Sequence, residues 1–192
     1  MGYEYRNPGR RFVSRPLMTV MSMAAIFVLT ACQSPCKPRP EVEESVPAKA
    51  LKYSLGKLDS PFAPDGRGPR EYSCAGMILD SYAQALGSSR FLVDGEGKAC
   101  GQVPLDVLYG KNVTLIQKEE AQPGDMVFFQ DERAEVVQAG LFIKWIDADT
   151  MGFIVASPYH GKVVIDTWPV FGIKQNLRVA GFGKLKPMQI GN

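Results

Sequence analysis

Histidine is nearly absent from this sequence, since His160 is the only one among 192 residues. Zinc sites draw four ligands from histidine, cysteine and carboxylate groups, and the only closely spaced cysteines are Cys32 and Cys36. Residues 95–101, GEGKACG, do not follow an apolar strand and therefore do not resemble a phosphate loop. The sequence thus predicts neither a metal site nor another cofactor.

A strong excess of positive charge is also absent. The formal net charge is +2, and residues 1–31 supply +3 of it through four arginines and one glutamate, so the remainder carries −1. Proteins that bind nucleic acid present a basic surface to the phosphates. A chain this close to neutrality gives no electrostatic reason to expect nucleic acid as a partner.

No apolar run is long enough to span a bilayer as a helix, which takes about 20 residues. Residues 17–30 follow the arginines as the apolar part of a signal peptide would, and they end in Leu29-Thr30-Ala31-Cys32. This ending is similar to the processing box of bacterial lipoproteins, which implies cleavage before Cys32 and acylation of Cys32. A plain signal peptide with an incidental cysteine is the alternative. Gln33, in place of an aspartate, favours the periplasmic face of the outer membrane.

The segment after Cys32 is rich in proline and charge. Residues 33–50 have few large apolar side chains, and SPFAPDGRGPR at 60–70 contains three prolines and two glycines. This composition is typical of a tether followed by a loop. We therefore expect a signal peptide over residues 1–31, an acylated cysteine with a tether over 32–70, and one folded domain over 71–192.

Three cysteines remain after Cys32 is assigned to lipid. Cys36, Cys74 and Cys100 are an odd number in an oxidising compartment, so at least one of them is free or pairs with another chain. A bridge between Cys36 and Cys100 that leaves Cys74 free is one option. The sequence does not establish this connectivity.

The predicted domain begins with helical spacing and continues with strands. In residues 74–87, Cys74, Ile78 and Tyr82 lie on one face, and Gly87 ends the helix. Residues 104–110 predict a short second helix. In residues 136–145 the odd-numbered side chains from Val137 to Trp145 alternate with Gln138 and its even-numbered neighbours. Helices followed by an antiparallel sheet predict an α+β fold, with strands at 125–130, 136–145, 153–157, 162–168 and 177–185.

Two motifs make the prediction more specific. YSCAG at 72–76 heads the first helix, and QPGDMVFF at 122–129 precedes the strand that contains Gly140. Together they resemble the NlpC-type cell-wall cysteine endopeptidases, whose members carry Tyr-Asp-Cys-Ser-Gly, Gly-Asp-Leu-Val-Phe-Phe and His-Val-Gly-Ile in this order. The resemblance covers about residues 70–187 and implies a compact papain-like fold. In the second motif, Asp125 is expected to bond backbone amides.

The resemblance also implies roles for individual residues. Cys74 takes the nucleophile position, whose thiolate in active relatives attacks a stem peptide of peptidoglycan while a histidine transfers the proton. The alternative for Cys74 is a small buried thiol at a helix end. The resemblance places Tyr72, Ser73 and Ala75 in substrate binding. Ser73 and Ala75 replace the aspartate and serine that hold the amino end of the substrate in relatives.

The position of the catalytic histidine is occupied by Gln138, and Val155 stands where many relatives carry the residue that orients the histidine. An amide does not accept and return a proton near pH 7. Losing the histidine of a nucleophilic triad costs on the order of a million-fold in turnover. His160, in a predicted turn, is the one candidate for a substitute base, with Asp166 as its orienting residue. An exposed turn histidine without a catalytic role is the alternative.

The sequence therefore predicts a cell-envelope lipoprotein that has this fold, is catalytically impaired, and binds peptidoglycan stem peptides or an envelope protein. An active peptidoglycan cysteine endopeptidase that uses Cys74 with His160 is the first alternative. A structural component of an envelope assembly is the second. Trp145 and Trp168 are expected to be core or rim aromatics rather than platforms for sugar rings.

Overall fold

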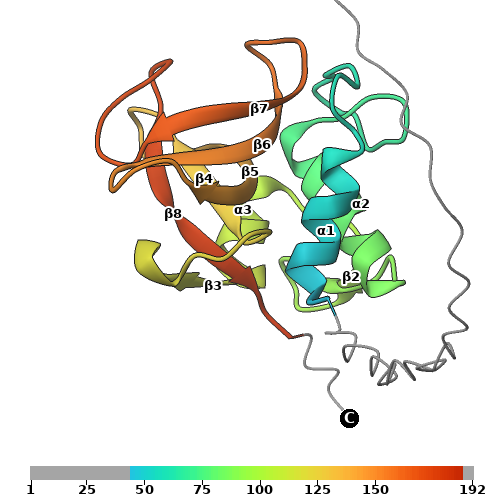
Figure 1. Ribbon diagram of the computed structural model, residues 1–192. Coiled ribbons are helices and arrows are strands. Elements are labelled where there is room, and N and C mark those ends of the chain that lie inside the picture. The colour runs from blue at the N-terminus through green and yellow to red at the C-terminus, as the bar shows by residue number, and fades with distance from the viewer. Residues whose placement is uncertain (1–43, 188–192) are drawn as a thin grey trace, which may run out of the picture. The chain divides into compact units, whose positions relative to one another are not determined.

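The computed structural model describes residues 44–187 of the chain, in which helices are followed by a sheet (Figure 1). Six strands form one antiparallel sheet in the order β3-β8-β4-β5-β6-β7, and a two-stranded ribbon pairs β1 with β2. The predicted α+β class, with a cysteine at the start of a helix and an antiparallel sheet after it, is confirmed. The elements are α1 (Val46–Leu55), α2 (Cys74–Leu86), β1 (Leu92–Val93), β2 (Ala99–Cys100), α3 (Leu105–Val107) with a π-helical turn (Leu108–Asn112), β3 (Val113–Ile116), β4 (Met126–Gln130), β5 (Val136–Trp145), β6 (Thr150–Ser157), β7 (Lys162–Pro169) and β8 (Arg178–Leu185).

Helix α2 forms where the sequence predicts it. The side chain of Ser73 caps its first turn by accepting a hydrogen bond of 3.0 Å from the Gly76 N–H, and Gly87 ends it. Met77, Ile78 and Tyr82 are fully buried on one face, as the spacing predicts. Between residues 44 and 187, no helix is long and apolar enough to cross a bilayer.

Helix α1 was not predicted, because its residues lie in the segment interpreted as a tether and loop. It packs along α2, and Figure 1 shows the two helices side by side on one side of the sheet. Ala50 and Leu51 are buried in the same cluster as α2, and the Tyr53 hydroxyl donates a hydrogen bond of 3.0 Å to Asp80. The prolines and charged residues around its short apolar pattern led to the prediction of a tether in place of a helix. The folded region therefore begins well before residue 71.

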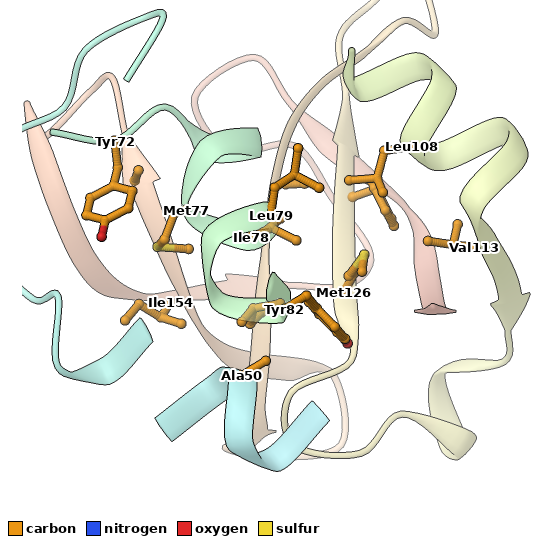
Figure 2. Packing of buried hydrophobic residues seen from close by; sticks show 14 of the residues in the cluster. Ala50, Tyr72, Met77, Ile78, Leu79, Tyr82, Leu108, Val113, Met126 and Ile154 are labelled. Carbon is orange, nitrogen blue, oxygen red and sulfur yellow. The ribbon is translucent and has the colours of Figure 1, made fainter. Parts of the chain in front are cut away.

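The sheet buries apolar side chains on both faces. One cluster fills the space between the sheet and the helices, and Figure 2 shows Met77 and Ile78 of α2 together with Met126 and Ile154 of the strands. The buried residues of the second cluster all come from strands. Since β7 and β8 both contribute buried residues to this cluster, the sheet curls around it. The second cluster consists of Val127, Phe129, Phe142, Met151, Phe153, Val155, Trp168 and Phe182.

The predicted alternation along β5 is wrong at its far end. Ala139 and Leu141 face the helices as expected, but Trp145 packs against Phe142 and Phe182, with ring centroids 5.1 and 5.7 Å away, on the opposite face. The cause is a register shift against β6 between Phe142 and Lys144, which changes the face of every later residue. Trp145 and Trp168 are both packed aromatics, in agreement with the sequence prediction.

The QPGDMVFF motif is structural, as expected. The Asp125 Oδ2 atom accepts a hydrogen bond of 2.8 Å from the backbone N–H of Gln122, which closes the turn before β4. The Tyr82 hydroxyl donates a hydrogen bond of 3.0 Å to the carbonyl of Gly124 and so ties α2 to this turn. Asp125 Oδ1 is buried without a hydrogen-bond partner among the described residues, and burial raises the pKa of the Asp125 carboxyl.

Leu51→Ala tests whether α1 belongs to the fold. Because Leu51 is 8% exposed and packs in the main cluster, we expect the substitution to lower the free energy of unfolding by about 2–4 kcal/mol. Lys52→Ala, on the exposed side of the same helix, should change it by less than about 0.5 kcal/mol. Chemical denaturation followed by circular dichroism measures both, and equal small effects would mean that α1 is not part of the cooperative unit.

Asp125→Asn tests the buried carboxyl. The raised pKa means that the folded state binds a proton more tightly than the unfolded chain, so wild-type stability decreases as pH increases through the carboxyl range. Asparagine keeps an acceptor for Gln122 and removes the buried charge. We expect the variant to be more stable than wild type at pH 7 by on the order of 1 kcal/mol, with the difference disappearing at pH 3. A less stable variant at pH 7 would show that attraction to Lys184, 3.9 Å away, outweighs burial.

Candidate functional site

Cys74 is the first residue of α2 and lies against the sheet. The backbone N–H groups of Ala139, Ala75 and Cys74 itself point at its sulfur, and its side chain packs on the second apolar cluster. Burial raises the pKa of the Cys74 thiol, and the hydrogen bonds from these amides offset only part of that effect. The thiol is therefore protonated at neutral pH. Activated catalytic cysteines have the opposite shift, which a neighbouring histidine or other cation produces.

The start of α2 lies where β5 and β6 separate. The pairing between these strands begins at Leu141 and Ile154, whereas the first half of β5 pairs with β4. Helix α2 contacts both β5 and β6. Gly140 permits the close approach of the strands at this point, because a Cβ atom there would lie 2.5 Å from the carbonyl oxygen of Ile154. A glycine at position 140 is therefore required for steric reasons.

Gln138 precedes the residue whose amide contacts Cys74. It is opposite Phe129 of β4 in the sheet register, and its side chain is only 6% exposed. Its side-chain amide makes no hydrogen bond to any other residue in the range 44–187. The structure therefore brings Cys74 and Gln138 into the same neighbourhood, with an unpaired amide at the position that the resemblance assigns to histidine.

Val155 lies on β6, in the second apolar cluster, on which Cys74 packs. It is 1% exposed. An aliphatic side chain has no atom that could orient an imidazole or hold a proton. The three positions to which the resemblance assigns a catalytic triad therefore carry a thiol, an amide and an isopropyl group.

A pocket of about 360 Å³ opens beside the first turn of α2. Ser73 and Ala75 line it, as the prediction of a substrate site requires, and Leu79 and Val103 supply apolar surface. Asp65 and Arg67 add one charge of each sign at exposed positions, and neither forms an ion pair with another described residue. Neither residue was predicted, because PDGRG was interpreted only as a loop. The signal in the sequence was the pair of opposite charges next to the YSCAG motif.

The Ser73 hydroxyl forms both of its hydrogen bonds within the protein. It donates a hydrogen bond of 2.9 Å to the carbonyl of Gly66 and accepts one from the N–H of Gly76. Gly76 is required here, because a Cβ atom at this position would overlap the Gly66 carbonyl oxygen. Ser73 thus fixes the loop to the helix, and a ligand in the pocket would meet only its side.

Tyr72, predicted to contact substrate, is instead part of the core. Its side chain is 0% exposed and lies among the buried residues of the main cluster (Figure 2). Its hydroxyl donates a hydrogen bond of 2.9 Å to Asp80 Oδ2, the atom that also accepts from Tyr53. Burial and the Asp80 carboxylate raise the pKa of Tyr72. Tyr72 therefore positions α2 against α1 and does not line the pocket.

His160 lies in the exposed turn between β6 and β7. Its Nδ1 atom is 3.0 Å from the Ser157 hydroxyl, and its ring packs against Tyr159. Asp166 pairs with Lys174 at 2.8 Å, and no hydrogen bond among residues 44–187 joins it to His160 or joins His160 to Cys74. These contacts account for His160 as a turn residue and give it no place at the thiol.

Two of the four cysteines lie within the described residues. Cys74 and Cys100, the two cysteines between residues 44 and 187, are free thiols in this structure. Cys32, predicted to be acylated, and Cys36, the suggested partner of Cys100, lie outside the described residues.

No protein-family model and no curated protein matches the sequence. Solved structures do match. NlpC1 from Trichomonas vaginalis is 18% identical over 75% of this chain and 45% of its own, with a TM-score of 0.52. A protein of the NLP/P60 family from Staphylococcus aureus subsp. aureus Mu50, described as similar to lipoprotein, is 18% identical over 78% and 44%, with a TM-score of 0.51.

This domain has the NlpC/P60 fold. An NlpC/P60 family protein from Bacillus cereus ATCC 10987 agrees, at 16% identity over 75% of this chain and 41% of its own, with a TM-score of 0.51. The chain thus spans less than half the length of these structures, and identities this low carry the fold and nothing further. The NlpC-type fold expected from YSCAG and QPGDMVFF is confirmed.

The raised pKa predicts the alkylation of Cys74. At pH 7.5 we expect iodoacetamide to label Cys74 about tenfold or more slowly than a free cysteine in solution, because the nucleophile is the thiolate and burial disfavours it. The rate should increase at each step between pH 7 and pH 10. Mass spectrometry of the peptide that contains Cys74 separates it from Cys100. Rapid labelling at pH 6 would instead reveal an activated thiolate.

Gly76→Ala tests the contact between the loop and α2. The added methyl group has no space beside the Gly66 carbonyl, so we expect the free energy of unfolding to decrease by about 2 kcal/mol or more. Gly95→Ala is the matched control, since a Cβ atom there would meet nothing within 4 Å. Denaturant titration of the two variants decides this, and a Gly76→Ala protein as stable as the control would contradict the described packing.

Proposed function

We propose that this protein is a catalytically impaired NlpC/P60 protein of the bacterial cell envelope that binds peptidoglycan stem peptides at the site beside Cys74. The observation that carries the proposal is Gln138, which directly precedes the residue whose backbone N–H contacts the Cys74 sulfur and stands where the resemblance requires a histidine. The fold has been kept around this position while the groups that transfer protons have been replaced.

The absence of useful hydrolysis follows from the chemistry of these side chains. Amide hydrolysis by a thiol needs a group that removes the thiol proton and then protonates the leaving amine. Gln138 does neither, Val155 has no polar atom, and burial keeps the Cys74 thiol protonated. Oxyanion stabilisation by the amides at the start of α2 would by itself support only a small fraction of the rate of an intact triad.

Peptide binding is supported by the pocket next to the thiol. Its volume of about 360 Å³ suits a few residues of peptide, and Asp65 and Arg67 offer an anion and a cation at its edge. A stem peptide carries both amino and carboxylate groups, so charges of both signs are complementary to it. Because both side chains are exposed, each contributes about 1 kcal/mol or less and affects selectivity more than affinity.

Location in the envelope is supported by the sequence outside the described residues. The Leu-Thr-Ala-Cys ending at Cys32 resembles a lipoprotein box, and an acylated Cys32 would hold the domain at the periplasmic face of the outer membrane, within reach of peptidoglycan. The peptidoglycan ligand and the lipid anchor are therefore consistent with each other. An envelope protein is the alternative partner for the same pocket.

Sedimentation with purified sacculi tests this function. We expect the wild-type protein to sediment with sacculi and to leave the muropeptide profile unchanged, with Cys74→Ala behaving identically because the thiol performs no reaction. New amino termini that disappear in Cys74→Ala would show an active endopeptidase. Failure to sediment, together with a co-purifying envelope protein, would favour the role of an assembly component.

Arg67→Glu tests the pocket. Reversing this charge leaves the pocket with two acidic groups, so we expect the affinity for sacculi to decrease about three- to tenfold. Arg178→Glu, an exposed arginine on β8 outside this pocket, is the control and should bind as wild type does. Increasing the salt concentration should weaken the wild type more than Arg67→Glu. Equal binding by both variants would show that this pocket does not take part in binding sacculi.

A further inference from the structure

A second pocket, of about 420 Å³, lies beside the last turns of α2, whereas the pocket next to the thiol lies beside its first turns. Its walls come from the start of α1, the end of α2, the turn before β4 and the end of β8. The two pockets share no lining residue. Large apolar or aromatic side chains supply much of the wall, among them Val46, Tyr82, Leu86, Phe91 and Leu185. This size and this lining are typical of a site for a small molecule.

One buried charged group belongs to the wall of this second pocket. Asp125 lines the pocket, and only 1% of its surface is exposed. Its Oδ2 atom accepts the hydrogen bond from the Gln122 N–H, but its Oδ1 atom has no hydrogen-bond partner within residues 44–187. The turn before β4 therefore uses one of the two oxygens. Native proteins rarely leave a buried polar atom unpaired, since this lowers stability. A hydrogen-bond donor on a ligand in the pocket would supply the missing partner.

The charges around Asp125 favour a donor that is itself neutral. The Lys184 Nζ atom lies 3.9 Å from Asp125 Oδ2, and Lys186 also lines the pocket. An ammonium group on the ligand would be repelled by both lysines, and a carboxylate would lie against the Asp125 carboxylate in a site that excludes water. Because Lys184 already balances the charge of Asp125, an uncharged N–H or O–H completes the hydrogen bonding without adding a charge.

We propose that this second pocket binds a neutral, largely apolar small molecule whose N–H or O–H group donates a hydrogen bond to Asp125 Oδ1. The apolar body of the ligand packs against Leu86, Phe91 and Leu185. Indoles and phenols have this chemistry. The site goes beyond the proposed function and does not depend on it, because it shares no lining residue with the pocket beside Cys74.

Indole and 1-methylindole are a matched pair of probes, because the methyl group removes the N–H donor and keeps the ring. Titration of the full chain, followed by ligand-detected saturation-transfer NMR, measures both affinities. We expect a dissociation constant of about 1 mM or tighter for indole, and binding of 1-methylindole that is about tenfold or more weaker. The measurement is made at pH 8, which favours the ionised carboxylate, since burial raises the pKa of Asp125.

Two variants test the two parts of the site. Leu86→Lys places an ammonium in the apolar wall, so the affinity for indole should decrease tenfold or more. Leu58→Lys is the matched control, because Leu58 is 40% exposed, Leu86 is 38% exposed, and only Leu86 lines this pocket. In Asp125→Asn the side-chain carbonyl is needed by the Gln122 N–H, so the NH₂ group takes the place of Oδ1 and the preference for indole should disappear.

A preference for indole that is absent in Asp125→Asn, together with weaker binding in Leu86→Lys but not in Leu58→Lys, supports the second site. Equal affinities of the wild type for the two probes overturn it, and so does indole binding that is absent in the wild type or unchanged in Leu86→Lys. If Asp125→Asn does not fold, the wild-type preference and the two leucine variants decide the question. The binding of sacculi is measured separately, so failure of this site leaves the proposed function standing.

Discussion

The contact of the first turn of α2 with β5 is the constraint on which the site depends. The Ala139 amide meets the Cys74 sulfur, Gly140 lets β5 and β6 approach each other beside it, and Ser73 ties the helix start to the loop at Gly66. These are contacts of backbone and small side chains. None of these contacts involves a general base, so the arrangement does not require one.

The two family motifs differ in what they preserve. In QPGDMVFF the residues have structural roles, because Asp125 closes a turn and the apolar residues fill both faces of the sheet. In YSCAG, Gly76 and the Ser73 cap also have structural roles, since Gly76 leaves room for the Gly66 carbonyl and Ser73 caps α2. The positions that differ from the family form are those to which the resemblance assigns proton transfer and ligand contact. The proposed function, binding without turnover, is consistent with this distribution.

Sequence reasoning predicted the parts of the fold that are encoded locally. The spacing around Ile78 and Tyr82 was sufficient to place α2, and the strand patterns placed β4, β5, β6, β7 and β8. The short strands β1, β2 and β3 were not predicted. The sequence-based predictions were wrong where the outcome depends on packing between elements that are distant in the sequence. The face of Trp145 depends on a register shift against β6, α1 depends on Ala50 and Leu51 fitting against α2, and the burial of Tyr72 depends on Asp80. The motif placed Cys74 and Gln138 in one neighbourhood, but the unpaired state of the amide required coordinates.

Asp80 has a consequence for where this domain can be cut. One oxygen of its carboxylate accepts from Tyr53 of α1 and from Tyr72 at the entry to α2, so a single atom joins the two helices. A fragment that starts at the motif, near residue 71, would lose one of these donors and would leave the apolar side of α2 uncovered. Boundaries drawn from motif matches alone therefore divide a cooperative unit, and recombinant fragments of such divergent domains should include the preceding thirty residues or so to remain folded.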